Sequence, residues 1–416
     1  MYSHFPLGKW AATLMSACAK AILSKHEGRV EQLLWILNEL ASPYGDCEQR
    51  LAFYFLQALF YKMNGSGLAS HKALCLAMER TSSFDSMRRT ILKFQEVSPW
   101  TTFGHVACNG AILEAFDGET KVHIVDVSNT FCSQWPTLLE ALATRPDGAP
   151  SLRLSTVMIS QDPSSVKVMK EVGARLERFA RLMGVPFEFK VHQEMNMDKL
   201  HDYQKLSALL DVRSGEALAI NCNLALHQVS TKGGALLSEV NMDIGPLKDG
   251  RDLVLQTFNS LSPKIFTLIE EEADMVTQDF FTNIQESLRF YALYFETLQV
   301  SFPKISEERL LLERIVGRDV LSLLACTPYD VEGDENFQSF SSNISCQKRE
   351  SSTQWDARLA KSGFKVSPFS NDIMDDVRAL IKRYKEGWSL DFNQEQTCLQ
   401  LNWKDQTTVF ASTWKC

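Results

Sequence analysis

The stretch "KVHIVDVSNTFCSQWP", residues 121–136, decides the fold of this chain. Its first half is a short β-branched, apolar run with Asp126 near its end, which predicts a buried strand. A helical pattern begins at Trp135, so the residues between form the turn of a strand–turn–helix unit. In a doubly wound α/β fold, glycines in that turn let the backbone approach a cofactor. This turn has no glycine, and Phe131 and Cys132 stand where space is needed.

Short β-rich runs alternate with helical patterns after residue 100, which predicts βαβ units and a mainly parallel sheet. The expected strands are 122–127, 152–158, 187–191, 217–224 and 264–270. The closing segment 388–415 has alternating runs joined by polar turns, which predicts an antiparallel pair that finishes the sheet. The expected fold class is α/β, with a Rossmann-like, methyltransferase-like core.

The first ninety residues carry apolar residues at spacings of three and four, typical of amphipathic helices. These stripes either pack on one another or offer a surface to a helical partner. The candidate partner contacts are Leu33, Leu37, Leu40, Phe55 and Leu59.

Two domains are expected, a helical cap over residues 1–98 and an α/β core over 99–416. The core would include two long helices near 276–299 and 305–324, and a polar loop at 327–352.

Composition argues against several functional classes. The net charge of −8 opposes a DNA-gripping surface, and no stretch is long and apolar enough to cross a membrane. The ten cysteines stand singly, as expected of reduced thiols in the cytosol or nucleus. No histidine spacing typical of zinc sites occurs, and neither a P-loop nor a G-x-S-x-G motif is present.

The acidic residues give little indication of a catalytic, cofactor-binding or metal-binding site. Nothing acidic precedes Asp162 at the end of the second strand, where a ribose ligand is expected. The run "EEEAD", residues 270–274, continues an extended segment whose consecutive side chains point to opposite faces. We therefore interpret this run as solvated surface, and expect no catalytic, metal-binding or cofactor-binding residue.

The chain resembles the GRAS family of plant transcriptional regulators, and most closely its SHORT-ROOT-like subgroup, over essentially its whole length. Leucine-rich helices lead, and "VHIVDVSNTFCSQWP" resembles the VHIID motif. "LLDVRSGEALAINCNLALHQV" is similar to the second leucine-rich region, "RDLVLQTFNSLSPKIFTLIEEEAD" to the PFYRE block, and "LLERIVGRDV" to the RVER motif. The closing SAW motif is matched by Trp355, Gly363, Phe364, Trp403, Ser412 and Trp414. Ser128 and Cys132 replace an aspartate and a glycine of the commoner VHIID form.

The resemblance implies a non-catalytic regulator in the nucleus, with the cytoplasm as a second location. Its implied partners are other GRAS proteins of the SCARECROW-like type and C2H2 zinc-finger transcription factors, with DNA reached mainly through them and no membrane. It implies no cofactor. A methyltransferase-like enzyme or a small-molecule receptor on the same fold stays open as an alternative.

Several motif residues have expected structural roles. Asp126, Gln134 and Trp135 either brace the sheet against its first helix or shape a groove for a partner. Trp403 and Trp414 lie in alternating runs, where aromatic residues favour sheet packing. The full set of motif positions is His123, Asp126, Gln134, Trp135, Pro136, Trp355, Trp403 and Trp414.

Overall fold

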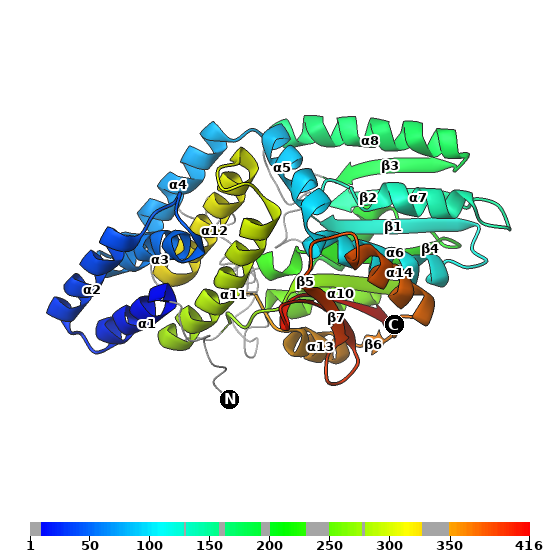
Figure 1. Cartoon of the computed structure of the whole chain (residues 1–416). Helices are drawn as coiled ribbons and strands as arrows, with labels where there is room; N and C mark the ends of the chain where they lie inside the picture. Colours follow the sequence, from blue (N-terminus) through cyan, green and yellow to red (C-terminus); the bar gives the residue numbers. More distant parts are fainter. Residues whose placement is uncertain are drawn as a thin grey trace. The chain divides into compact units, whose positions relative to one another are not determined.

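The computed structural model describes residues 10–128, 130–157, 163–192, 200–229, 249–276, 279–326 and 349–416. The chain divides into two compact units, each built from two separate stretches of sequence (Figure 1). Unit 1 comprises Met1–Val97 and Glu272–Glu350, and unit 2 comprises Ser98–Glu271 and Ser351–Cys416. Most of the loop expected at 327–352 lies outside the described residues.

Unit 1 is helical. Its helices are α1 (Trp10–Leu23), α2 (Glu27–Leu40), α3 (Cys47–Met63), α4 (Gly67–Thr81), α5 (Phe84–Val97), α11 (Phe280–Ser301) and α12 (Glu307–Ala325). The first stretch ends at Val97, one residue before the boundary expected at 98, and Glu272–Glu350, expected in the α/β core, belongs to unit 1 instead. The helices α11 and α12 pack against α1 and α3, and so belong with the helical cap.

Specific local features explain this packing. The helix α3 begins after Asp46, which forms a capping box with Gln49. Gly317 on α12 has no side chain, and the ring of Tyr54 on α3 takes that space. Because helices approach closely where one residue is small, α12 can lie directly on α3.

Unit 2 is built on one sheet with the order β3-β2-β1-β4-β5-β9-β8-β7, and β6 pairs with β9. Its strands are β1 (Lys121–Ser128), β2 (Ser151–Val157), β3 (Phe187–His192), β4 (Ala217–Asn223), β5 (Ile265–Glu271), β6 (Lys365–Val366), β7 (Trp388–Phe392), β8 (Cys398–Trp403) and β9 (Gln406–Lys415). The first five are parallel, at the positions that the sequence predicts. The expected antiparallel pair is instead three long strands, β7 to β9, with the short β6.

Helices cover both faces of this sheet. They are α6 (Pro99–Ala115), α7 (Trp135–Ala143), α8 (Pro163–Met183), α9 (Tyr203–Leu210), α10 (Gly250–Ser260), α13 (Ser352–Lys361) and α14 (Asn371–Ile381), with a short 3₁₀ turn η2 (Leu226–Gln228). The helix α8 ends before Gly184, whose φ of 74° is the left-handed cap that the sequence predicts. In the described part of the chain, no helix combines the length and apolarity needed to cross a membrane.

The two faces differ in what they bury. On one face, Gly104 of α6 leaves room for Ile269, and Gly173 of α8 leaves room for Phe189. On the other face, residues of α9, α10 and α13 form an apolar core with β1, β2, β4 and β5. Trp355 and Trp414 are fully buried in that second core.

Candidate functional site at the carboxyl edge of the sheet

The strand order reverses direction between β1 and β4. From β1 the chain moves outward to β2 and β3, then returns to β4 on the other side of β1. Ser128 and Asn223, the last residues of β1 and β4, are register partners. Open α/β sheets bind ligands outside the carboxyl ends of the strands at such a switch point. This edge is therefore the candidate site, and the side chains at it indicate whether a ligand would fit there.

The turn after β1 keeps a backbone that glycine would favour. Phe131 and Cys132 have φ values of 54° and 58°, both in the left-handed region. This conformation costs roughly 1–2 kcal/mol for each non-glycine residue. Both side chains are buried, the phenyl ring at 8% exposure and the thiol at 2%. The turn therefore keeps two left-handed residues without glycine, and both of their side chains are buried.

A network of buried polar side chains occupies the space below that turn. The carboxylate of Asp126 accepts hydrogen bonds from Trp135 Nε1 at 2.9 Å, Asn221 Nδ2 at 3.0 Å and Ser128 Oγ at 3.0 Å. These three donors come from α7, β4 and the end of β1. The carboxylate that would bind a ribose or amine in a cofactor enzyme is thus bound by the protein itself.

Gln134 extends this network to α6. Its Nε2 donates to Asn109 Oδ1 at 3.0 Å and to Asn221 Oδ1 at 3.3 Å. Asn109 Nδ2 donates back to the Gln134 carbonyl at 3.0 Å. The contacts of Asp126, Gln134 and Trp135 therefore join β1, β4, α6 and α7, which is the geometry of a brace.

The ionisation of Asp126 reflects its burial. Loss of solvent raises its pKa from 3.8 to about 6, although the three hydrogen bonds lower it. Perturbed pKa values also occur in ion-pair networks that do no chemistry. Here each carboxylate oxygen already has a protein donor, so the shift is explained without a substrate.

The acidic run at 270–274 does not form solvated surface throughout. Glu270 and Glu271 are buried at the end of β5. Glu270 Oε1 accepts the backbone N–H groups of residues 225, 226 and 227 at 2.8–3.3 Å, and Oε2 pairs with His227 Nδ1 at 2.7 Å. Burial raises the pKa of Glu270, but His227 and these N–H groups outweigh it and hold that pKa below its usual value.

Glu271 accepts the indole N–H of Trp100 at 3.0 Å. The surface interpretation of this run was wrong for these two residues, because the η2 turn and α6 cover the end of β5. They serve the fold, one as a cap for a turn and the other as an anchor for a helix.

His123 also has a structural environment. Its Nε2 lies 2.9 Å from Ser155 Oγ, and its Nδ1 lies 3.0 Å from Arg153 Nη2. Burial, aided by the Arg153 guanidinium, lowers its pKa to about 3, so this imidazole is neutral. Because the group beside Nδ1 is a cation and not a carboxylate, the pair does not resemble a Ser–His–Asp arrangement.

Among the described residues, Asn223 ends β4 and therefore lies at the switch point. Asn223 has no hydrogen-bond partner there for either polar atom of its side chain, and neither atom is reachable by solvent. Within the same residues, no group of three or more His, Cys, Asp and Glu side chains could hold a metal ion.

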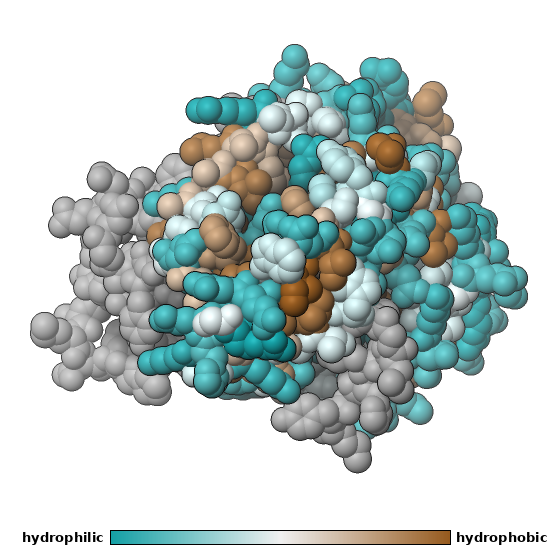
Figure 2. All heavy atoms as spheres, turned by 60° about the vertical axis from the view of Figure 1, so that its left-hand side comes forward, coloured by the Kyte–Doolittle hydropathy of each residue, from teal (hydrophilic) through white to brown (hydrophobic). Residues whose placement is uncertain are grey.

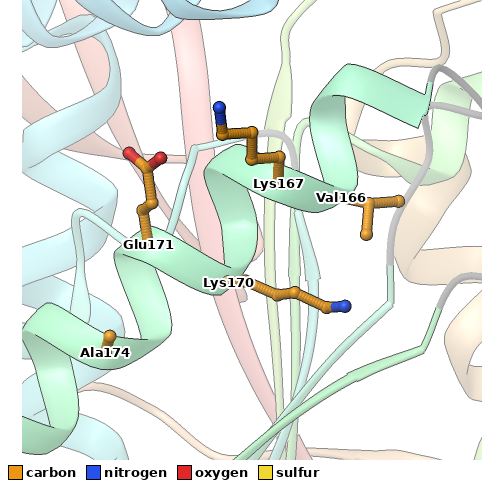
Figure 3. A pocket seen from close by; sticks show the side chains of 5 residues that line it. All are labelled: Val166, Lys167, Lys170, Glu171 and Ala174. Atoms are coloured by element: carbon orange, nitrogen blue, oxygen red, sulfur yellow. The ribbon is translucent and has the colours of Figure 1, made fainter.

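A shallow hollow lies along the first half of α8 (Figure 3). It is lined by Val166, Lys167, Lys170, Glu171 and Ala174. Figure 3 shows Lys167 and Glu171 on one side of the helix and Lys170 with Val166 on the other. The lining side chains that the structure describes all come from α8.

The leucine stripes of the first helices face inward. Leu33, Leu37, Phe55 and Leu59 are buried in unit 1, and only Leu40 is exposed, at 42%. The prediction that the four buried side chains contact a partner directly is wrong, because they pack within the helical unit. A spacing of three and four marks the face that is buried, whichever molecule buries it.

Apart from Leu40, several exposed apolar side chains in or beside these helices lie off the stripes. Trp35 is 65% exposed, and Tyr44, Phe60 and Met63 are also exposed. Figure 2 turns the side with α1 to α4 in Figure 1 towards the viewer, and shows apolar patches among polar residues. The apolar periodicity gave no sign of Trp35, because its neighbours on the helix face, Glu31, Gln32, Asn38 and Glu39, are polar.

The remaining motif positions are buried or lie at the start of a helix. Trp403 lies in β8 and is 1% exposed, as is Trp414 in β9, while Trp355 on α13 is fully buried. Pro136 is at the start of α7, where its missing N–H costs no helical hydrogen bond.

Comparisons with known proteins agree with this arrangement. The model of the GRAS domain family matches residues 11–415. The solved structure titled "Crystal Structure of SCL7 in Oryza sativa" superposes with a TM-score of 0.76 at 26% identity, covering 98% of this chain and 99% of that one. The predicted α/β fold, with its mainly parallel sheet and N-terminal helices, is thereby confirmed.

Comparison with named relatives narrows the position of the chain within this family. It is 46% identical to Protein SHORT-ROOT of Arabidopsis thaliana, over 98% of this chain and 73% of that protein. It is 42% identical to Protein SHORT-ROOT 2 of Oryza sativa subsp. japonica, over 98% of this chain and 69% of that protein. It is 30% identical to Scarecrow-like transcription factor PAT1 of Arabidopsis thaliana, over 96% of this chain and 75% of that protein. The chain therefore belongs to the GRAS domain family and is a SHORT-ROOT-like plant regulator.

Proposed function

We propose that this chain regulates transcription without catalysing a reaction, by holding partner proteins together. The observation that carries the proposal is the turn after β1, where Phe131 and Cys132 are buried in left-handed backbone at positions where a cofactor loop needs glycine. Side chains of the protein already donate hydrogen bonds to the Asp126 carboxylate, which a cofactor would otherwise use as its acceptor. A fold that has filled its own ligand site is suited to presenting surfaces to other proteins.

The helical unit supplies a suitable surface. Trp35 on α2 is 65% exposed, with Glu31 and Glu39 one turn away on either side. Tryptophan is the residue type most enriched among the side chains that dominate binding energy at interfaces. We therefore replace the buried leucine stripe with Trp35 as the leading candidate for contact with a partner.

The proposed partners follow from the family. They are other GRAS proteins of the SCARECROW-like type and C2H2 zinc-finger transcription factors, which would bring the chain to DNA. The proposed location is the nucleus, with the cytoplasm second. The net charge of −8 supports indirect contact with DNA, because binding to phosphates needs a concentrated basic face.

Calorimetry tests the non-catalytic part of the proposal. Titration of the purified chain with S-adenosylmethionine, NAD and NADP should show no saturable heat. A micromolar dissociation constant for any of them would favour the methyltransferase-like or receptor alternative.

A matched pair of variants tests the partner surface. The dissociation constant of a purified SCARECROW-like GRAS domain should rise by about ten-fold or more for Trp35→Glu, as expected for an interface hot spot. Leu182→Glu adds the same charge at an exposed apolar residue of α8 in unit 2, whereas Trp35 belongs to unit 1, and should leave binding unchanged. Equal affinity for both variants would exclude Trp35 from the interface.

Fluorescence anisotropy tests the DNA part. The purified chain alone should form no sequence-specific complex at about 0.15 M salt, because salt weakens electrostatic binding to DNA phosphates. A specific complex under those conditions would mean that the chain reads DNA itself.

A further inference from the structure

Two turns of unit 1 are joined by one buried arginine. Arg50 donates from Nε to the carbonyl oxygen of Gly45 at 2.9 Å, and from Nη2 to that of Lys304 at 2.6 Å. Because both donors belong to one rigid guanidinium, the two carbonyl groups lie side by side. The turn between α2 and α3 is therefore adjacent to the turn between α11 and α12, although about 250 residues separate them.

The arginine is itself held in place. Its Nη1 pairs with Glu313 at 2.5 Å, and the other oxygen of Glu313 accepts from Arg309 Nε at 2.7 Å. All three side chains are buried. Charged hydrogen bonds in a buried site impose strict geometry. The two turns are thus fixed before any partner arrives, which reduces the entropy that binding would cost.

Apolar side chains stand on the outside of these turns. Tyr44, next to Gly45, is 58% exposed, and Ile305, next to Lys304, is 71% exposed. Leu40 is exposed at the end of α2, and its carbonyl oxygen accepts from Gln49 at the start of α3. We call Leu40, Tyr44 and Ile305 the clamped tip. Large apolar side chains that a rigid frame holds in water are typical of docking sites.

Acidic residues lie within two positions of each member of the clamped tip along the chain. Glu39, Asp46 and Glu307 are exposed, whereas Lys304 is the exposed base of the two turns. Asp46 and Glu307 lie at the N-termini of α3 and α12, where the helix dipole favours a negative charge. A second copy of this chain would place these acids against one another, which disfavours self-association through the tip.

We propose that the clamped tip docks a basic segment of a partner protein, with an apolar side chain of that segment between Tyr44 and Ile305. The inference rests on the proposed function, since it supposes that the chain works by binding proteins. The inference adds two things to the proposed function: a docking site on the helical unit, and a positive charge for the segment that binds there. The apolar contact supplies affinity, and the nearby acids Glu39, Asp46 and Glu307 favour a partner segment of positive charge.

A pair of peptides tests this without any family partner. One is an amphipathic helical peptide of leucine and lysine, and the other carries glutamate at every lysine position. The full-length chain should bind the basic peptide at least about ten-fold more tightly than the acidic one. Ile305→Glu and Tyr44→Glu should each remove most of that binding, with unchanged melting temperature because both side chains are exposed.

The matched control is Leu182→Glu on α8, which adds the same charge at an exposed leucine of unit 2 and should bind like the wild type. In Glu39→Gln with Glu307→Gln, the salt dependence of basic-peptide binding should weaken. Equal affinity for the two peptides, or equal losses for Ile305→Glu and Leu182→Glu, would overturn the proposal. Since no GRAS partner is used, that result would leave the Trp35 assay, and with it the proposed function, untouched.

Discussion

The indole nitrogen of Trp135 donates a 2.9 Å hydrogen bond to the carboxylate of Asp126, and both side chains are fully buried. The bond joins the first strand of the sheet to the helix that follows it. In a nucleotide-binding relative of this architecture, the space between that strand and helix faces the ligand. Here it holds a contact between the protein's own side chains, so the site stabilises the fold.

Trp135→Phe should lower the free energy of unfolding by about 2–4 kcal/mol, because it removes a buried charged hydrogen bond and leaves a small cavity. Urea unfolding measures this change. Trp35→Phe alters an exposed tryptophan and should change stability by less than about 0.5 kcal/mol. If the two variants are equally stable, the bond to Asp126 contributes nothing measurable.

The raised pKa of Asp126 predicts a pH dependence. The native state holds this proton up to about pH 6, whereas the unfolded chain releases it near 3.8, so the stability contributed by this group falls as pH rises between these values. Between about pH 4.5 and 7 this amounts to about 2 kcal/mol.

Asp126→Asn removes that titration. The difference in unfolding free energy between wild type and variant should therefore decrease by this amount over the same pH range. Urea unfolding at several pH values measures it, and parallel curves would show that the pKa of Asp126 is not raised.

The left-handed backbone of the turn after β1 predicts that glycine is better tolerated than valine at position 132. Glycine relieves the left-handed backbone but loses a small buried side chain, so Cys132→Gly should lie within about 1 kcal/mol of the wild type. Cys132→Val places a β-branched side chain at a φ of 58° and should cost about 2 kcal/mol or more. Thermal or urea unfolding ranks the two. A valine variant as stable as the glycine variant would show that the positive φ imposes no constraint.

Glu270→Gln should destabilise the chain by about 1–3 kcal/mol, because the charged acceptor of three backbone N–H groups becomes neutral. Asp274→Asn removes the same charge at an exposed position of the same acidic run, and should have a much smaller effect. Chemical unfolding compares the two variants. Similar losses would restore the interpretation of this run as solvated surface.

The closing segment should be indispensable for folding. The strand β9 lies between β5 and β8, and a chain of residues 1–402 lacks it together with two buried tryptophans. Losing one such side chain costs about 3–5 kcal/mol, a large part of domain stability. The truncated chain should be insoluble or partly unfolded, while a chain of residues 1–415 loses only the exposed Cys416 and should fold normally. A soluble 1–402 chain with a sharp, unshifted melting transition would make the segment a docking peptide.

Local patterns predicted much of the fold. The five parallel strands and the end of α8 at Gly184 follow from periodicity and from one glycine, because both depend on neighbouring residues. The hydrogen-bond network of Asp126, Gln134 and Trp135 is compatible with the brace, one of the two roles expected from the sequence, which stays a prediction. The network's other members, Asn221 and Asn109, carry no signal in the sequence, because an asparagine far along the chain announces no contact.

The sequence by itself determined the family, the strand–turn–helix unit and the loss of its glycines, since these reside in contiguous residues. Only the tertiary structure decided that α11 and α12 belong to the helical unit, that the leucine stripes face inward, and that Glu270 is buried. Each of these depends on segments far apart in the chain, such as Arg50 with Lys304 and Glu313. Amphipathic periodicity states that a face will be buried but not by what, because hydrophobic burial has no preferred partner or direction.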